Sequence, residues 1–432
     1  MSINRSYQPW IICLSGALFF YYVFFQMAMF NSLSEDLLSA FNLHAAQLGN
    51  LAGAYFLADA IILIPAGLLL DRFSTRTLCL FVLACVTLST FAFAYTDSLT
   101  IAMTAHAMAG IGNAFAFLGS LQLAARWLPK NRLAIGMGLI ITIGMLGGLV
   151  AQTPFTLLIE SIGWRNAVAV NACFGVIIWI LMLVTLKDHP HTHSISVQRF
   201  KESTIKPLKQ VLLNSQNWIC GSYTMLMYLP IVILGELWGS LFLKQARGLP
   251  TTTATSIAGM IFLGMIVGSP VLGWLSDKIE RRQLPMLITA ILLLINLVMI
   301  LYLPNLNIST LMLLFFSLGF FSCGQCIAYP TMTEINPPHL TSTALSIVAI
   351  ILNLGSAIFQ PIFGQLMNRH HTEQIVTSYT AHDYRTAMLS LLVVIAVAII
   401  LSLKIKETFC KIKASEPVEL TAFSNEPEEA TH

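Results

Sequence analysis

Three ionisable side chains lie deep inside apolar stretches of this sequence, where they could carry protons: Asp59, His106 and Glu236. Asp59 lies twelve residues before Asp71, which ends its apolar stretch, so about 18 Å separates the two in a helix. An ionisable group near the centre of a bilayer costs about 2.5–3.5 kcal/mol and usually faces a cavity. Proton coupling is one interpretation of these three residues. The alternative for Asp59 is a side chain hydrogen-bonded to a neighbouring helix, and for His106 a satisfied buried imidazole.

Glu236 lies in the outer third of its helix, where the alternative is an interfacial carboxylate near Trp238 and Lys244. Pro230 and Gly235, which precede it, suggest a bent or broken helix.

Uncharged polar side chains at similar depth form a second set, which we interpret as candidates for lining a substrate cavity. Tyr22 and Gln26 are four residues apart and share a helix face, and so do His106 and Asn113, seven apart. The alternative for each is a packing role between helices. The complete set is Tyr22, Gln26, Asn113, Tyr228, Gln325 and Asn353.

The elements that must position these residues are membrane-spanning helices. The chain is 56% hydrophobic and 10% charged, whereas soluble proteins carry about 25% charged residues. Apolar runs of about 20 residues, long enough to cross a bilayer, recur along the chain. The first run exceeds the core of a signal peptide, so we interpret it as a span. Twelve helices are predicted, near 9–31, 46–70, 76–95, 99–124, 132–158, 164–186, 217–243, 251–275, 284–303, 308–332, 340–366 and 384–404.

Charge placement predicts the orientation of these helices. With the N-terminus in the cytoplasm, all but five of the 23 lysines and arginines fall on the cytoplasmic side. The exceptions are Arg165, Lys244, Arg247, Arg369 and Arg385. Basic residues gather in cytoplasmic loops, so both termini are predicted to be cytoplasmic. The net charge of +3 then reflects topology and gives no indication of nucleic-acid binding.

A short charged motif occurs twice, 206 positions apart, each time after an apolar stretch. Its residues are Gly67, Asp71, Arg72 and Arg76 in the first copy, and Gly273, Asp277, Lys278 and Arg282 in the second. A second match, between 146–154 and 354–361, has an offset of 208. Duplicated halves are typical of secondary transporters, which bind substrate near the bilayer midplane between the halves.

These motifs resemble those of the major facilitator superfamily, over about residues 9 to 405. The resemblance implies two pseudo-symmetric six-helix bundles, with helices 1, 4, 7 and 10 lining a central cavity. It also implies that Asp71 contacts the start of helix 11, near His339, in a gating interaction. The basic residues beside Asp71 could also hold lipid phosphates. Ser74 stands where many members have Gly.

The stretch 41–49 resembles, in addition, a bacterial branch associated with lysosomal dipeptide transporters. That branch implies an acidic residue and an arginine in helix 1. Here the corresponding residues 22–26 read Tyr-Val-Phe-Phe-Gln and lack both. The likeness to bacterial members implies a place in the bacterial cytoplasmic (inner) membrane.

The predicted organisation is a six-helix bundle over 1–186, a cytoplasmic linker over 187–215, a second bundle over 216–405 and a cytoplasmic tail, expected to be disordered, over 406–432. The Cys323–Cys326 pair and the histidines at 189, 191 and 193 are interpreted as packing and linker residues, so no metal or cofactor is predicted. The sequence contains neither H-E-x-x-H nor G-x-S-x-G, which argues against an enzyme.

The sequence therefore predicts a secondary active transporter that moves a small polar organic solute, such as an amino acid or small peptide, by alternating access. Proton-coupled uptake is the favoured mode. The expected partners are the solute, the proton and membrane lipids, with no obligate protein partner. Two alternatives stay open at this point: proton-driven efflux of amphiphilic compounds, and a transport-inactive solute sensor.

Overall fold

The protein is a bundle of long, apolar helices. The computed structural model describes residues 7–188, 210–303, 306–337, 340–370 and 379–411. Within these residues, twelve helical segments are long and apolar enough to cross a membrane, as predicted. The predicted linker and tail fall mostly outside the described residues, as do the histidines at 189, 191 and 193. The exact domain boundaries therefore stay predictions.

The first six spans come from seven helices, because the fifth span is interrupted. They are α1 (Gln8–Ala40), α2 (Ala45–Arg72), α3 (Thr75–Tyr95), α4 (Leu99–Trp127), α5 (Lys130–Val150) with α6 (Thr153–Ile162), and α7 (Trp164–Thr185).

The second six spans contain two interrupted helices. They are α9 (Ser215–Leu234) continued by α10 (Gly239–Leu241) and η1 (Phe242–Ala246), α11 (Thr251–Lys278), α12 (Gln283–Tyr302), α13 (Ile308–Ser322) with η2 (Cys323–Ile327) and α14 (Ala328–Ile335), α15 (Thr341–Met367), and α16 (Ala381–Lys404).

Helices dominate because a bilayer core offers no water to the backbone N–H and C=O groups, which must pair within each segment. Breaks occur where residues oppose that pairing. Pro154 begins α6 after the break at Gln152, and α9 contains Pro230 and ends beside Gly235. The break that Pro230 and Gly235 predict in the seventh span is confirmed, and it lies between α9 and α10. We call it the break in helix 7, where helix 7 means the seventh span and not α7.

The first helix is longer than its apolar stretch suggests. It was predicted to end near residue 31 but continues to Ala40. The polar residues after 30 do not stop it, since Ser34 and Ser39 donate hydrogen bonds to carbonyls three residues earlier. The chain turns only at Asn42, whose φ is +48°. Polarity marks where a helix leaves the membrane, and this helix extends beyond that point.

Glycines set the closest helix crossings at equivalent places in the two repeats. A Cβ added at Gly110 in α4 would lie 2.0 Å from the Tyr55 carbonyl oxygen of α2. A Cβ at Gly319 in α13 would likewise lie 2.0 Å from the Ile261 carbonyl oxygen of α11. The duplication in the sequence is thus also a duplication of packing, with glycine at both crossings.

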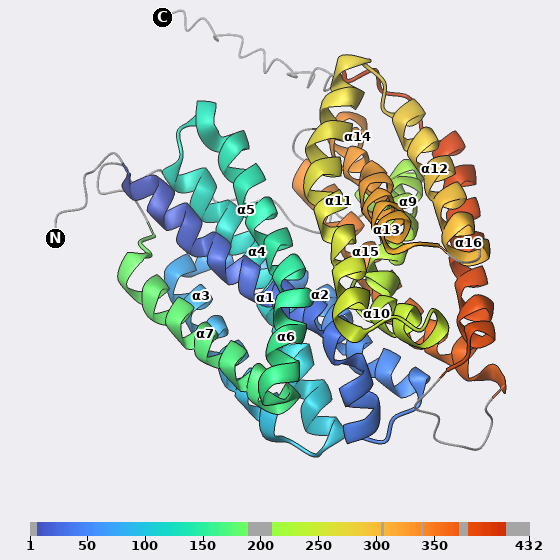
Figure 1. Cartoon of the computed structure of the whole chain (residues 1–432). Coiled ribbons are helices and arrows are strands. Elements are labelled where there is room, and N and C mark those ends of the chain that lie inside the picture. The colour runs from blue at the N-terminus through green and yellow to red at the C-terminus, as the bar shows by residue number, and fades with distance from the viewer. Residues whose placement is uncertain (1–6, 189–209, 304–305, 338–339, 371–378, 412–432) are drawn as a thin grey trace, which may run out of the picture.

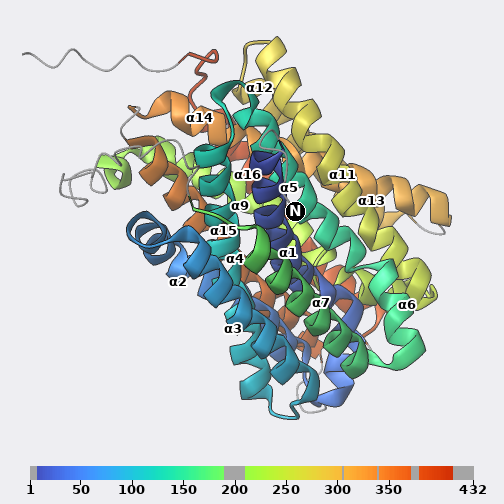
Figure 2. The same cartoon turned by 90° about the vertical axis from the view of Figure 1, so that its left-hand side faces the viewer.

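The two bundles lean against each other along part of their length. Figure 1 shows α1–α7, in blue to green, beside α9–α16, in yellow-green to red, with the ribbons diverging toward the ends of α5 and α11 at the top. Figure 2 shows the same assembly from its left-hand side, with α1 in front of α4 and α5. We call the end that carries the loops at 71–76 and 277–282 the motif face, and the other end the opposite face.

Replacing Gly110 with Ala is expected to destabilise the first bundle. The added carbon would push α4 from the backbone of α2, and overpacking of this kind costs about 1–3 kcal/mol. The melting temperature of the purified protein should fall. Gly138→Ala is the matched control, because nothing lies within 4 Å of a Cβ at that position. An equal loss in both variants would contradict the proposed crossing.

Candidate functional site

Buried amides join the two bundles at the opposite face. The Asn31 side chain of α1 donates to Gln152 Oε1 at 2.7 Å, and Asn31 Oδ1 accepts from the Ser240 backbone N–H at 3.0 Å. The Ser240 hydroxyl donates to the Asn31 carbonyl oxygen. Asn31 and Gln152 belong to the first bundle and Ser240 to the second, so these bonds cross between the bundles.

Two glutamines at equivalent positions of the repeats bind the break in helix 7. Gln152, from the first bundle, donates to the Gly235 carbonyl at 3.2 Å. Gln360, from the second, donates to the Val232 carbonyl at 3.0 Å and accepts from the Trp238 indole N–H at 3.2 Å. The break frees backbone groups that need partners in an apolar environment, and the duplicated glutamines supply them.

Further contacts complete the closure of the opposite face. Glu35 of α1 forms an ion pair with Lys244 of η1. The Ala45 N–H donates to the Tyr379 hydroxyl at 2.9 Å, and the hydroxyls of Thr153 and Ser256 lie 2.8 Å apart. Sequence reasoning missed these residues as a site. The only signal was that Gln152 and Gln360 fall within the duplicated stretch.

Asp59 makes the last hydrogen bond between described residues of the two bundles, counted from the opposite face, and the structure brings it together with two of the predicted cavity residues. Its Oδ2 accepts from Asn113 Nδ2 of α4 at 2.7 Å and from Asn353 Nδ2 of α15 at 2.9 Å. The side chain is 2% exposed. Among the described residues, neither Asp59 Oδ1 nor Asn113 Oδ1 has a hydrogen-bond partner. One carboxyl oxygen thus links both bundles.

The Asp59–Asn353 contact is the innermost hydrogen bond between the bundles. Of the bonds whose two partners are both described, none joins the bundles between Asp59 and the motif face. From Ala45 to Asp59, by contrast, α2 packs closely against α15: a Cβ at Gly49 would lie 2.5 Å from the Gln360 carbonyl oxygen. The described conformation is closed at the opposite face and parted toward the motif face.

Glu236 forms a second buried carboxyl site, in the break of helix 7. Its Oε1 accepts from the Tyr228 hydroxyl at 3.0 Å, and its Oε2 has no partner among the described residues. The His106 ring stacks on Phe30 at 3.8 Å between centroids and lies 5.3 Å from the ring of Tyr55, which is four residues before Asp59 in α2.

Three predicted cavity residues lie elsewhere. Tyr22 and Gln26 share a face, as predicted, but that face meets α3: both donate to Thr90 Oγ1, at 3.4 and 3.0 Å. They therefore pack inside the first bundle. Gln325 is buried in the η2 segment that interrupts the tenth span.

The motif glycines have no close neighbours in this conformation. Beside a Cβ at Gly67 only Leu118 comes within 4 Å, and a Cβ at Gly273 would meet nothing. Asp71 accepts a bond from Gln122 of α4 at 3.3 Å. The eleventh span is α15, and its predicted start at His339 lies outside the described residues, so the gating contact of Asp71 stays a prediction.

Each motif is instead tied to its own bundle by a carboxylate from the chain beyond its sixth span. Asp188 accepts from the Arg76 backbone N–H at 2.8 Å and from the Ser74 hydroxyl at 2.5 Å. At the equivalent position, Glu407 accepts from the Arg282 N–H at 2.7 Å. Both carboxylates thereby meet the N–H groups at the start of a helix, where negative charge is favoured. Sequence reasoning missed this pair, because its members lie far from the motifs along the chain.

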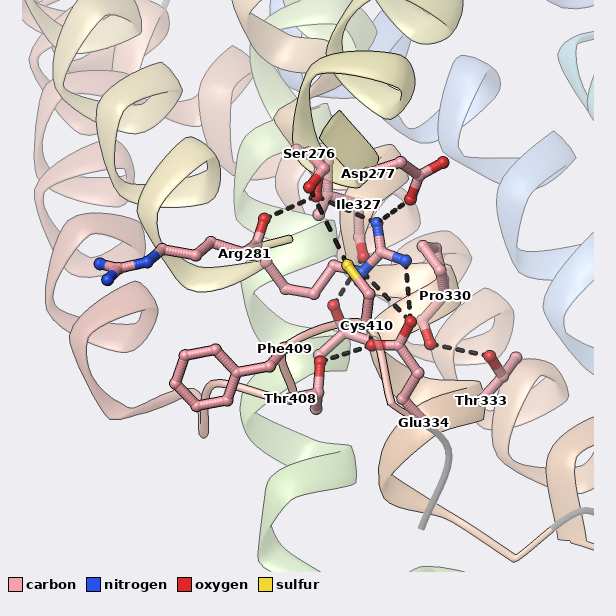
Figure 3. Close-up of polar contacts among 12 residues, drawn as sticks. Ser276, Asp277, Arg281, Ile327, Pro330, Thr333, Glu334, Thr408, Phe409 and Cys410 are labelled. Carbon is pink, nitrogen blue, oxygen red and sulfur yellow. Dashed lines mark hydrogen bonds and ion pairs between the residues drawn. The ribbon is translucent and has the colours of Figure 1, made fainter. Parts of the chain in front are cut away.

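The second motif contains the strongest charge cluster (Figure 3). Arg282 donates to Glu334 of α14 at 2.8 Å and to Asp277 at 2.6 Å. Burial disfavours its charge, but these bonds outweigh burial and raise the pKa of Arg282 above its ordinary value. Lys278 lies 4.8 Å from the Trp274 ring, while Arg72 is exposed.

The described residues contain no group of three or more potential metal ligands. Cys323 and Cys326 both have their sulfur 3.4 Å from the Ser269 hydroxyl and make no disulfide. Among the described residues, the hydrogen bonds and ion pairs between the bundles come from amides, hydroxyls, one ion pair and one carboxyl. Groups of this kind can bind a polar solute and exchange a proton.

Solved structures resemble this fold along nearly its whole length. A bacterial homologue of the human lysosomal transporter Spinster, in an inward-facing and unoccupied conformation, has a TM-score of 0.78 at 15% identity, covering 93% of this chain and 98% of that one. A variant of the nucleoside transporter NupG has a TM-score of 0.72 at 14% identity, covering 91% and 99%.

Sequence comparison finds relatives with several roles. The membrane sensor protein UhpC of Escherichia coli is 23% identical over 82% of this chain and 86% of its own length. A probable hexose phosphate transport protein of Chlamydia muridarum is 20% identical over 65% of this chain and 67% of its own length. The probable sulfoacetate transporter SauU of Cupriavidus necator is 22% identical over 56% and 58%.

The family model described as the Major Facilitator Superfamily matches residues 14–360 and 237–420, which together span most of the chain. The fold, the duplicated motifs and this match agree with one another. The chain is an integral, multi-pass membrane protein of a family of transporters rather than enzymes, and it belongs to the major facilitator superfamily.

Proposed function

We propose that this secondary transporter takes up a small polar organic solute, such as an amino acid or a small peptide, together with a proton. The observation that carries the proposal is the Asp59 carboxyl, which is bonded to both bundles where they part. The proposed site is the region between the bundles around Asp59, Asn113, Asn353, Glu236 and Tyr228. The proposed setting is a bacterial inner membrane, with both termini and the motif face cytoplasmic.

The local chemistry at Asp59 supports exchange of a proton. Asp59 Oδ1 and Asn113 Oδ1 are both acceptors, and neither has a donor among the described residues. A proton on Asp59 converts one of these acceptors into a donor. In the part of the chain that the structure describes, no lysine or arginine hydrogen-bonds to Asp59, so none of these side chains acts as a fixed counter-ion to hold it ionised. Glu236, with its unpaired Oε2, is a second proposed proton site.

Proton binding at Asp59 would also change the balance between conformations. An amide donates more strongly to a carboxylate than to a neutral carboxyl, so protonation alters the Asp59–Asn353 bond between the bundles. A ligand shifts an equilibrium only through its different affinity for the two states. Because this bond lies at the point where the bundles separate, its strength differs between conformations. The motif contacts around Asp71 and Asp277 are proposed to form in the conformation that closes the motif face.

The charge distribution supports a neutral, zwitterionic or cationic solute. In the described chain the basic side chains lie at helix ends and in loops, and the residues around Asp59 include none. A phosphate or sulfonate group brought there would be an unpaired buried charge, which is costly. The anionic solutes in the names of several relatives are therefore not carried over to this chain.

A solute sensor is the second candidate, because the relatives include the membrane sensor protein UhpC. Efflux is a weaker alternative: the drug efflux pump JefA of Mycobacterium tuberculosis is 30% identical, but over 31% of this chain. Purified protein in liposomes separates these functions. Proton-driven accumulation supports uptake, outward movement supports efflux, and solute binding without any flux supports the sensor.

Gln152→Leu is expected to open the opposite face. The change removes the acceptor for Asn31 and the donor to the Gly235 carbonyl, and leaving such groups unpaired costs about 1–3 kcal/mol. Spin labels at Ser98 and Arg369, in a Cys173→Ser background, would report the separation of the bundles. The population of molecules with the longer distance between the two labels should grow at least about five-fold.

The matched control for this variant is Gln365→Leu, which replaces an exposed glutamine of α15. Its distance distribution should equal that of the parent protein. If Gln152→Leu leaves the distribution unchanged as well, the buried amides do not hold the opposite face closed.

Asp59→Asn is expected to abolish proton-driven accumulation while leaving solute exchange. An amide keeps the size of the carboxyl but cannot gain or lose a proton at neutral pH. Proteoliposomes are loaded and diluted to impose a pH gradient, and candidate amino acids and dipeptides that bind the purified protein are supplied outside. Accumulation should fall to the level without a gradient, whereas counterflow of labelled solute should persist.

Asp97→Asn is the control, because this carboxylate pairs with Arg165 at the opposite face and its side chain is 90% exposed. It should accumulate solute as the parent protein does. Full gradient-driven accumulation by the Asp59→Asn variant would overturn the assignment of Asp59. Loss of both accumulation and counterflow, together with loss of solute binding, would instead place Asp59 in solute recognition alone.

A further inference from the structure

A cavity of about 490 Å³ opens at the opposite face, outside the region between the bundles. Its walls come from η1, the end of α12, the start of α13 and the start of α16, all in the second bundle. Two arginines, Arg247 and Arg385, belong to its lining, and none of the described residues in that lining is acidic. The proposed transport mechanism makes no use of this cavity.

Arg247 is held in place by the end of a helix. Its guanidinium donates to the carbonyls of Ile300 at 2.6 Å and Leu303 at 3.2 Å, in the last turn of α12 and just beyond it, and lies 5.9 Å from the Phe242 ring. Helix C-termini attract cations, so these bonds fix the position of the group. A guanidinium has five N–H donors, and these two bonds leave others for a ligand.

Arg385, on the first turns of α16, makes no hydrogen bond or ion pair with any described residue, and its side chain is exposed. Burial, followed by the positive charge of Arg385, lowers the pKa of the Arg247 guanidinium. The two arginines that line the cavity are thus close enough to repel each other, and no described lining residue supplies a carboxylate. An anion bound there would offset this repulsion and use the free donors.

The rest of the lining is apolar and lies at the ends of membrane-spanning helices. Leu301, Leu306 and Leu311 contribute to the wall, and Tyr302, the last residue of α12, is 52% exposed. Tyrosine is common at the boundary between lipid and water. A ligand that combines an anionic group with a hydrocarbon part fits such a wall better than a fully hydrated anion does.

We propose that this cavity binds the headgroup phosphate of an anionic phospholipid, with Arg247 and Arg385 on the phosphate and the leucines along the first part of an acyl chain. The proposal commits to a lipid because the cavity lies where three spanning helices end and because leucines line its wall beside the two arginines. It is independent of the transported solute and of the proposed coupling at Asp59.

The test measures lipid binding to the full chain, purified in detergent, by native mass spectrometry. Phosphatidylglycerol and phosphatidylcholine are titrated separately, because both contain a phosphate but only the first carries a net charge. The parent protein should bind phosphatidylglycerol more tightly. Arg385→Gln should weaken that binding about five-fold, since one arginine near a membrane surface contributes about 1 kcal/mol toward anionic lipid. Binding of phosphatidylcholine should not change.

Arg369→Gln is the matched control: it removes an exposed arginine from the same face, outside the cavity. It should keep the affinity of the parent protein for phosphatidylglycerol. If the Arg369 and Arg385 variants weakened phosphatidylglycerol binding equally, the effect would be one of general surface charge, and the proposed lipid site would be wrong. Inorganic phosphate forms the last arm. If it alone raised the melting temperature, in a manner lost in Arg385→Gln, the ligand would be a soluble phosphate and the lipid assignment would be wrong.

Discussion

One carboxyl oxygen, Oδ2 of Asp59, accepts hydrogen bonds from α4 in its own bundle and from α15 in the other. Between this atom and the opposite face, α2 and α15 pack with glycine against backbone, and buried amides and an ion pair join the remaining helices. Toward the motif face no hydrogen bond between described residues joins the bundles. A rocking motion of one bundle against the other about Asp59 would change the surroundings of this residue. The interior of each bundle would change less, because its own glycine crossings are kept.

The closed face shows how a duplicated fold makes one gate from two equivalent parts. Gln152 and Gln360 occupy corresponding places, but only the second bundle has the break in helix 7 that both of them bind. The duplication thus provides both glutamine amides, and the break that is specific to the seventh span provides the backbone carbonyls that they bind. At the motif face the repeats differ in charge. In the second bundle Glu334 accepts a hydrogen bond from Arg282, whereas the residue that corresponds to Glu334 in the first bundle is Arg126, which donates to Thr75 at 3.0 Å. Symmetry of backbone therefore does not imply symmetry of contacts.

Much of this architecture could be predicted from the sequence, because lipid imposes a simple rule on backbone polar groups. The twelve spans follow from apolar length, and the break in helix 7 follows from Pro230 with Gly235. Periodicity also showed correctly that Tyr22 and Gln26 share a face, but it cannot say which neighbour that face meets, and here it meets Thr90. Likewise, Asn113 and Asn353 are separate candidates in the sequence. Only the packing of α2, α4 and α15 shows that both donate to the same oxygen, Oδ2 of Asp59.

The relatives whose names include hexose phosphates and sulfoacetate share this fold, yet the charges around Asp59 argue for a different solute. The family fold fixes where a solute can sit and how the bundles move, while the side chains at mid-depth decide which charge can be tolerated there. In the proposed function, the Asp59 carboxyl, which no described lysine or arginine accompanies, would let the site take up a proton and a neutral or zwitterionic solute together. One positive charge would then cross in each cycle, so that a membrane potential adds about 2.3 kcal/mol per 100 mV to the chemical gradient. A dianionic solute carried with one proton would move against that same potential. The absence of basic groups near Asp59 therefore bears on energetics as well as on recognition.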